Sequence, residues 1–319
     1  MKKNTKIALF STLFAIFILA LLLGSRYDLQ ISKALAELND GNYYSSNPFA
    51  IIFETFGESI VYILCTISLA IIFFKIKCTE FKKNWLKIFL MVMCILFSLL
   101  VAGYCVFKAS NYLKIHLSLE EFFATAFSKI LLVGITAGLL TLIFAFCSNI
   151  SDSSLQYLYK WAIAVILVAL VSNGIAQVTK HIFDRTRYRA MIYEGYTDFD
   201  YYTPWFVINT KKFASTSAFY GDYFKSFPSG HCCAAASFFL LLLLPAFNPN
   251  LNNKKYIVPT TILCSLYTIL VMISRIVAGA HYLTDTLIGS FITIACIVLY
   301  YFVIIKNKKL KYLSSDTNK

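Results

Sequence analysis

Long apolar stretches are the feature that most constrains the fold of this 319-residue chain. A helix that crosses a membrane needs about 20 mostly apolar residues. We predict eight such spans, at residues 7–23, 49–74, 86–107, 122–147, 158–180, 231–246, 257–277 and 284–305. Only 14% of the residues are charged, whereas soluble domains are about a quarter charged. The predicted fold class is therefore all-α: a polytopic membrane bundle of about eight transmembrane helices.

The distribution of lysine and arginine predicts the orientation of this bundle. Cytoplasmic loops are generally enriched in both residues. With the N-terminus inside, the cytoplasmic segments hold more than half of the 29 lysines and arginines, and both termini lie in the cytoplasm. The basic segment 306–319 is then a cytoplasmic tail on the anionic inner leaflet. We expect a multi-pass plasma-membrane protein, and we interpret span 7–23 as an uncleaved anchor because no clear small-x-small cleavage site follows it.

Net charge and cysteine positions narrow the possible functions. A net charge of +13 would suit nucleic acid, but the cations flank the predicted spans. Anionic lipid headgroups explain them better, so we expect no nucleic-acid partner. All the cysteines except Cys78 lie in or beside predicted spans, where a thiol behaves as a small apolar group. The sequence has no CxxC or Cys/His zinc spacing, which argues against a disulfide scaffold and a structural zinc site.

The polar residues divide the chain into functional parts. Residues 1–150 form N-terminal transmembrane helices without evident catalytic motifs, and residues 151–305 carry the motifs described below. The predicted outer loop 188–227 is rich in tyrosine, phenylalanine and tryptophan, which favour the membrane–water boundary. We interpret it as a lid on the outer leaflet with short helical pieces. A compact cap packed on its own aromatic rings is the alternative.

His281 and Asp285 lie four residues apart at the start of the last predicted span. On a helix this spacing places both side chains on one face. A carboxylate beside an imidazole fixes the tautomer of the ring and leaves the other nitrogen free to attack. The alternative is a polar pair that only seals a helix end. Because ionisable groups at membrane depth are costly, we favour a function.

A second motif, Pro228, Ser229, Gly230 and His231, directly precedes an apolar run. Ser229 can cap the helix that follows, and the first backbone N–H groups of such a helix bind phosphate. Gly230 allows close approach of the backbone, and His231 can donate a proton to a departing oxygen. Taken alone, the tetrapeptide is no more than an ordinary helix cap.

Three cations accompany these motifs at the same predicted face of the membrane. Lys180 and Arg187 lie at and just beyond the end of span 158–180, and Arg275 ends span 257–277. Phosphate oxygens are natural bidentate partners of arginine. Ser274, which precedes Arg275, is expected to support the site from outside it. Without the other motifs, all of these cations would be interpreted as anchors at helix ends.

Further charged residues lie near the same predicted face. Glu54 and Glu58 share one face of the second span, and they either pair with the surplus arginines and support the site or remain an acidic pair in headgroup water. We expect Arg185 and Arg189 to contact headgroups or the aromatic loop. His116 is expected to be a loop residue.

Together, the three motifs resemble the signature of the type 2 phosphatidic acid phosphatase superfamily, membrane lipid phosphatases that share a helical core with vanadium-dependent haloperoxidases. The family pattern is Lys, six residues, Arg-Pro; then Pro-Ser-Gly-His; then Ser-Arg, five residues, His, three residues, Asp. Its order and spacing match residues 180–285, within a core of about 158–305. One position departs, because Tyr188 replaces the proline after Arg187. This change affects the shape of the loop rather than the chemistry.

The resemblance implies a role for each matched residue. His281 would be the nucleophile that takes the phosphoryl group, Asp285 would orient it, and His231 would be the general acid. The phosphate oxygens would be held by Lys180, Arg187, Ser229, Gly230 and Arg275. Residue chemistry alone points to the same set but leaves open which histidine attacks. No Asp/Glu cluster suited to magnesium is present in the sequence, so we expect a metal-independent reaction without a cofactor.

The expected function is hydrolysis of a phosphomonoester or pyrophosphate of a lipid, at the outer or periplasmic face, through a phosphohistidine intermediate. By resemblance, the candidate substrates are undecaprenyl or another polyprenyl pyrophosphate, phosphatidylglycerophosphate, phosphatidate and phosphorylated glycolipids. Two alternatives remain: a lipid-to-lipid phosphotransferase, and a non-catalytic lipid-binding membrane protein. The expected partners are the lipid substrate and membrane lipids, with no obligate protein partner. Abundant Ile, Phe, Asn and Lys favour a bacterial source.

Overall fold

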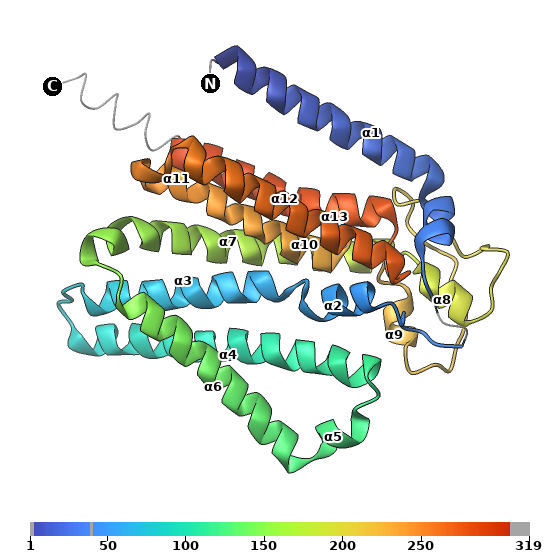
Figure 1. The fold of residues 1–319 in the computed structure, drawn as a ribbon, viewed down its shortest axis with the longest axis horizontal. Coiled ribbons are helices and arrows are strands. Elements are labelled where there is room, and N and C mark those ends of the chain that lie inside the picture. The colour runs from blue at the N-terminus through green and yellow to red at the C-terminus, as the bar shows by residue number, and fades with distance from the viewer. Residues whose placement is uncertain (1–2, 39–40, 307–319) are drawn as a thin grey trace.

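The computed structural model describes residues 3–38 and 41–306, and every regular element among them is a helix. Most of the long helices lie side by side along the length of the molecule (Figure 1). The elements are α1 (Lys3–Leu35), α2 (Pro48–Phe56), α3 (Ser59–Lys77), α4 (Asn84–His116), α5 (Glu120–Ala124), α6 (Ala126–Ser148), α7 (Asp152–Phe183), α8 (Tyr188–Tyr193), α9 (Tyr220–Tyr223), α10 (Gly230–Ala236), η1 (Ser237–Leu243), α11 (Leu244–Phe247), η2 (Pro249–Leu251), α12 (Lys254–Val277), α13 (Leu283–Tyr300) and η3 (Tyr301–Lys306).

Eight segments of the described chain are long and apolar enough to cross a membrane. They are Phe14–Leu35, Pro48–Lys77, Asn84–His116, Ala126–Ser148, Asp152–Phe183, Gly230–Phe247, Lys254–Val277 and Leu283–Ile305. Each overlaps one predicted span, which confirms the polytopic all-α bundle. The predicted span 7–23 lies within α1, which continues without a break through Gly24 and Ser25 to Leu35. Apart from Lys306, the predicted tail 306–319 lies outside the described residues.

Three of these segments are not continuous α-helices, and the last of them passes from α13 into the π-helix η3. The second is divided into α2 and α3 at Gly57, whose N–H still donates to Phe53 O (2.9 Å). The sixth passes through the 3₁₀ segment η1 before Pro245, which has no N–H to continue an α-helix. Side chains of neighbouring helices bind its carbonyls: Trp161 Nε1 donates to Leu240 O (2.8 Å), and Tyr256 Oη donates to Leu241 O (2.9 Å).

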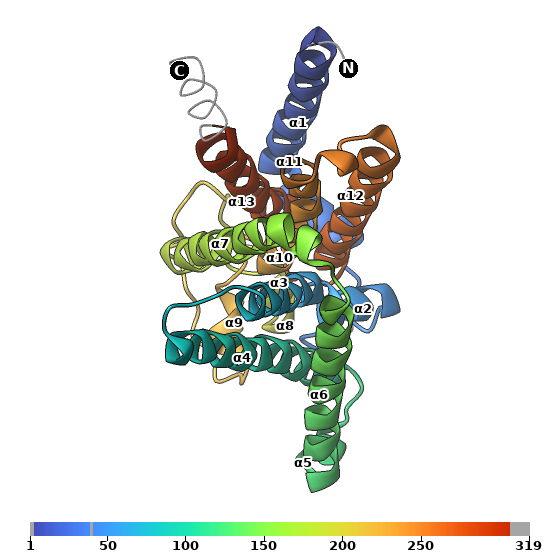
Figure 2. The same cartoon turned by 90° about the vertical axis from the view of Figure 1, so that its left-hand side faces the viewer.

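The motif-bearing helices form the centre of the bundle. α10 packs against α13, α12 and α7, and α3 packs against both α7 and α4. α1 stands apart from the main stack and reaches α13 (Figure 2). Gly24 permits this approach, because a Cβ there would lie 2.8 Å from Thr284 Cγ2. As a result, the end of α1 lies close to the start of α13.

The ends of α7 and α12 and the starts of α10 and α13 bring the three motifs to the same end of the bundle, beside α8 and α9 (Figure 1). α7 stops at Asp184, a residue in the left-handed conformation (φ 45°) that short polar side chains tolerate. α10 begins at its cap Ser229, whose hydroxyl accepts from Cys232 N. At the start of α13, Asp285 accepts from the N–H of Tyr282 (2.9 Å). We call this part of the molecule the motif end.

Residues 188–227 form a compact cap over the motif end. Two short helices, α8 and α9, lie within it. Its rings pack on one another and on Tyr43, including Phe213, Tyr223 and Phe224. This packing corresponds to the compact aromatic cap that was the alternative to a lid on the membrane surface. Tyr188, at the family's proline position, is the first residue of α8, and proline is also favoured at that position of a helix.

Candidate active site

Backbone hydrogen bonds hold the three motifs together at the motif end. The N–H of Ser229 donates to Asp285 O (3.0 Å), which joins the second motif to the third. The N–H of Ser226 donates to Arg185 O (3.0 Å), which joins the cap to the segment that follows Lys180. These backbone bonds therefore hold the motif segments next to one another independently of the contacts that the motif side chains make.

His281 is buried, with 1% of its surface exposed, and its two ring nitrogens have different partners. Nδ1 lies 2.5 Å from Ser226 O, a carbonyl that can only accept, so Nδ1 carries the proton. Nε2 lies 3.4 Å from Arg187 Nη1, which can only donate, so Nε2 carries the lone pair. Burial lowers the pKa of His281 well below its ordinary value, and nearby positive groups act in the same direction: Arg187, Lys180, Arg275 and His231. His281 is therefore a neutral imidazole with one nitrogen available for attack.

Asp285 reaches His281 through an intermediate residue. Its Oδ2 lies 3.9 Å from His281 Nδ1, too far for a hydrogen bond. The same Oδ2 accepts from Ser226 Oγ (2.5 Å), and Oδ1 accepts from Arg185 Nη1 (2.5 Å). Ser226, which the sequence analysis did not single out, thus links the predicted carboxylate to the predicted nucleophile.

His231 is the second buried imidazole at this end, and both of its nitrogens face oxygen atoms. Nδ1 lies 2.7 Å from Glu58 Oε1, and Nε2 lies 3.0 Å from the backbone oxygen of Glu54. The side chain of Glu58 also binds Lys108. Residues of the N-terminal half therefore supply both polar contacts of the predicted general acid.

Lys180 and Arg187 lie beside His281, the predicted nucleophile, and bind backbone oxygens. Lys180 Nζ donates to Lys225 O (3.0 Å). Arg187 Nη1 donates to Ala280 O (3.0 Å), next to His281 in the chain. Its Nη2 donates to the carboxylate of Asp222 in the cap (2.9 Å).

Among the three motif cations, Arg275 has the most N–H groups without a hydrogen-bond partner in the described residues. Its Nη2 donates to Glu54 Oε1 (2.8 Å). Within the described part of the chain, its buried Nε and Nη1 have no hydrogen-bond partner. Leaving buried donors unpaired costs free energy. These two groups are therefore suited to an anionic ligand.

The remaining motif residues shape the backbone around the cations. Ser229 caps α10, and its own carbonyl packs directly against Gly289 of α13. Gly230 follows at the first helical position, and a Cβ there would contact Lys180 Cε at 3.7 Å. The hydroxyl of Ser274 donates to Val271 O (2.7 Å) within its own helix. The Ser274 hydroxyl therefore binds within α12 and makes no hydrogen bond to the motif cations.

Arg185 and Arg189 lie deeper than expected from the sequence. Arg185 has no exposed surface; it binds Asp28 and Asp285 and donates to Thr203 O in the cap (2.8 Å). Arg189 binds Glu54 (3.1 Å) and Asp222 (3.1 Å). The expected contact with headgroups is excluded for Arg185 because the residue is fully buried, whereas contact with the aromatic loop is observed.

Acidic side chains of the first four helices pair with motif-end cations. Glu54 of α2 binds Arg275 and Arg189, and its second oxygen lies 3.2 Å from His116. His116 was expected in a loop, but it is the last residue of α4 and its side chain is buried. In the residues described, no group of three or more His, Cys, Asp or Glu side chains is placed to hold a metal ion.

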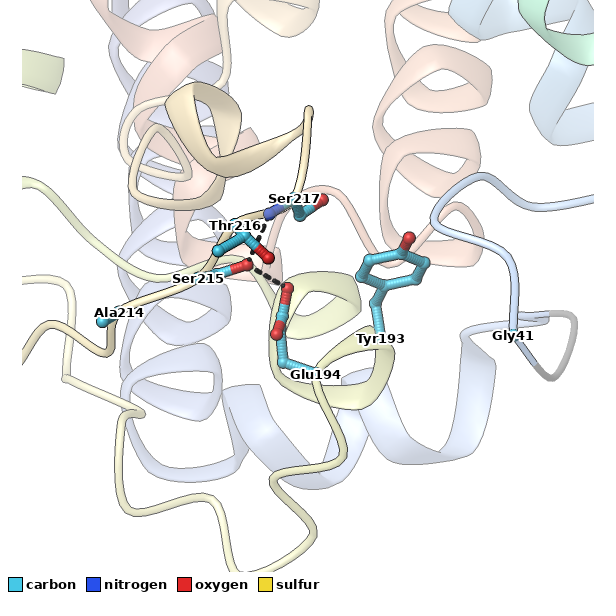
Figure 3. Close-up of a pocket in the computed structure, with 7 residues that line it drawn as sticks. All are labelled: Gly41, Tyr193, Glu194, Ala214, Ser215, Thr216 and Ser217. Carbon is cyan, nitrogen blue, oxygen red and sulfur yellow. Dashed lines mark hydrogen bonds between the residues drawn. The ribbon is translucent and has the colours of Figure 1, made fainter.

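An open depression of about 730 Å³ lies on the cap rather than among the motif residues. Its lining includes Tyr193, Glu194 and residues 214–217, and Figure 3 shows Glu194 facing Ser215. Glu194 accepts from Ser215 Oγ (2.6 Å) and Tyr223 Oη (2.5 Å). The carboxylate of Glu194 thus joins two parts of the cap. None of the predicted site residues lines the depression.

Comparison with known proteins agrees with the motifs. Residues 161–309 match the family model described as PAP2 superfamily. Searches of curated proteins and of solved structures found no match to the chain. The matched segment contains all three motifs and four of the spans in whole or in part, so it implies phosphatase-type activity in a membrane-spanning protein. Residues 161–309 of this chain thus match the PAP2 superfamily, in agreement with the resemblance that the three motifs carry.

Proposed function

We propose that this protein is a membrane lipid phosphatase that hydrolyses a phosphomonoester or pyrophosphate through a phosphohistidine at His281. The state of His281 supports this proposal most directly. A neutral imidazole whose Nδ1 is bound to a carbonyl can attack only through Nε2. That nitrogen lies beside Arg187, a cation able to bind a phosphoryl oxygen.

The first chemical step transfers the phosphoryl group to the protein. The lone pair of His281 Nε2 forms a P–N bond while the P–O bond to the leaving group breaks. His231 gives a proton to the leaving oxygen. Lys180, Arg187 and the unpaired N–H groups of Arg275 stabilise the charge on the phosphoryl oxygens.

The second step returns the site to its starting state. Water attacks phosphorus and the P–N bond breaks, so that Nε2 regains its lone pair. His231, now neutral, takes a proton from the attacking water and again becomes the acid. Inorganic phosphate leaves, and no metal or cofactor enters either step.

Membrane placement supports a lipid substrate. The motif residues lie at the ends of spans, where a phosphorylated headgroup of a lipid in the same leaflet is located. Polyprenyl pyrophosphate, phosphatidylglycerophosphate, phosphatidate and phosphorylated glycolipids all present such a group. The distribution of Lys and Arg supports a motif end that faces the outside or periplasm and termini that face the cytoplasm.

Phosphate release from a panel of purified lipid phosphates, with a chelator present, tests the activity. We expect wild-type protein in detergent to release phosphate and His281→Ala to release none while eluting as the same folded species. Equal release by both proteins would eliminate the assignment. An added acceptor lipid tests the phosphotransferase alternative, because transfer would phosphorylate the acceptor at the expense of free phosphate.

Orientation has a separate test in intact cells. Thr210 is an exposed residue of the cap. Asn252 is exposed and lies between η2 and α12, next to α11, which stands at the end of the bundle opposite α8 and α9 (Figure 1). In a Cys78→Ser background, a membrane-impermeant thiol reagent should label Thr210→Cys but not Asn252→Cys. The reverse labelling pattern would invert the proposed topology.

A further inference from the structure

We infer that Glu58, the residue that precedes α3 and lies outside the segment that matches the PAP2 superfamily model, is a positioning residue that keeps His231 protonated as the acid of the proposed reaction. This inference rests on the proposed function. It goes further because it assigns a residue of the N-terminal half a part in cleavage of the ester bond.

The contacts of the ring carry the inference. Glu58 Oε1 lies 2.7 Å from Nδ1, and the carbonyl of Glu54 lies 3.0 Å from Nε2. A carbonyl can only accept a hydrogen bond, and an ionised carboxylate can only accept. A neutral imidazole has one N–H and would leave one oxygen facing a lone pair. Both contacts are satisfied together only when both nitrogens carry protons.

The surroundings of Glu58 indicate that its carboxylate is ionised. Its second oxygen, Oε2, binds the ammonium group of Lys108, and Tyr62 Oη lies 3.4 Å from the same atom. Both groups can donate to a carboxylate. The side chain has little exposure, so water cannot replace these partners easily. Glu58 therefore presents a negative oxygen to Nδ1 while Lys108 holds the other oxygen.

Other groups around His231 do not replace Glu58. The carboxylate of Glu54 is directed at Arg275 and Arg189, so only its backbone oxygen faces the ring. The ring edge meets Tyr112 of α4 at 5.9 Å between centroids. The charged and titratable groups that act on the imidazole are Glu58, Lys108, Arg275, His281 and Tyr112. Glu58 is the acidic side chain among them.

This arrangement defines the path of the proton. In the resting site the Nε2 proton points at Glu54 O. When a substrate is bound, the leaving oxygen takes the place of that carbonyl and receives the proton as its bond to phosphorus breaks. Glu58 stays on Nδ1 throughout, so it orients the ring and stabilises its positive form without touching the substrate.

Leaving-group dependence tests this role. An alkoxide leaves poorly without a proton, whereas p-nitrophenolate leaves well without one. We expect Glu58→Gln to lower kcat on phosphatidate by about 100-fold, in the range ascribed to general acid catalysis. On p-nitrophenyl phosphate we expect kcat to fall by less than about fivefold, because this leaving group does not need the proton. The high-pH limb of kcat on phosphatidate should also move to lower pH.

A control variant completes the experiment. Glu120→Gln removes an exposed carboxylate of α5 and should keep the wild-type ratio between the two substrates. Equal losses on both substrates in Glu58→Gln would show a purely structural role and overturn the inference. His281→Ala separates this outcome from failure of the proposed function, because it must inactivate the protein toward both substrates if the phosphohistidine forms.

Discussion

Asp285 and His281 are connected through Ser226 rather than by a hydrogen bond of their own. The carboxylate accepts from Ser226 Oγ (2.5 Å), and the carbonyl of the same serine contacts His281 Nδ1 (2.5 Å). The direct separation is 3.9 Å. A single cap residue therefore links the position of the carboxylate to that of the proposed nucleophile.

This relationship predicts a graded response to substitution. Ser226→Ala removes the hydroxyl but keeps the carbonyl, so we expect kcat to fall about fivefold, equivalent to about 1 kcal/mol for one hydrogen bond. Asp285→Asn should lower kcat further, because it also breaks the ion pair with Arg185. Steady-state phosphate release measures both, with Thr210→Ala as an exposed control. A loss in Ser226→Ala as large as that in Asp285→Asn would contradict the proposed linkage.

The pH dependence of turnover follows from the environment of His281. Burial and the charges of Arg187 and Lys180 place its pKa well below the ordinary value of 6.5. The proposed nucleophile is active only when neutral, so activity should persist as the pH falls below 6.5 and should be lost only when the pH reaches the lowered pKa.

Arg187→Gln provides the corresponding variant. Removal of this cation makes protonation of His281 easier, so the acid limb of kcat should move to higher pH, whatever happens to KM. Rapid-quench measurement of the first turnover across the pH range gives the limb directly. An acid limb at or above 6.5 in the wild-type protein would contradict the assigned state of His281.

Arg185 should be important for stability. It is fully buried between Asp28 and Asp285, and replacement by leucine leaves two buried carboxylates without their cation. Loss of one partner of a buried ion pair typically costs about 3–5 kcal/mol. We expect thermal unfolding of Arg185→Leu in detergent at a clearly lower temperature. Lys212→Leu, which breaks the partly exposed pair with Asp184, should change it little.

The outcome for Arg185 shows what the sequence could and could not predict. The spans and the three motifs are local patterns. Hydropathy over about 20 residues identifies a span, and fixed spacing between residues identifies a motif. The partner of Arg185 on α1 lies 157 residues away in the chain, and Glu54 lies 221 residues from Arg275. Such pairs depend on how the helices pack, and no spacing rule relates them.

The same reason explains the unexpected features within single helices. The break at Gly57 and the 3₁₀ segment η1 lie in segments of high mean hydropathy. Side chains of distant helices bind carbonyls at both places: Tyr267 donates to Gly57 O, and Trp161 and Tyr256 donate to carbonyls of η1. Likewise, His116 was expected in a loop, but it is the last residue of α4 and its buried side chain lies beside Glu54. This contact depends on the packing of α4 against α2.

Close packing at Gly289 gives a final prediction about the backbone of the site. A Cβ at this position would lie 2.4 Å from Ser229 O and 3.3 Å from Ser229 N, so a larger residue must displace the backbone that caps α10. Overpacking of this kind typically costs about 1–3 kcal/mol. We expect Gly289→Ala to lower both the unfolding temperature and kcat, because Ser229 N also binds Asp285 O.

Gly138→Ala on α6 is the matched control for this substitution. No heavy atom lies within 4 Å of the added Cβ, and alanine favours a helix over glycine by about 1 kcal/mol. Its unfolding temperature should be unchanged or higher, with kcat as in the wild type. Wild-type kcat in Gly289→Ala would mean that the loop before α10 tolerates a shift, and that the phosphate is not held by the backbone around Ser229 and Gly230.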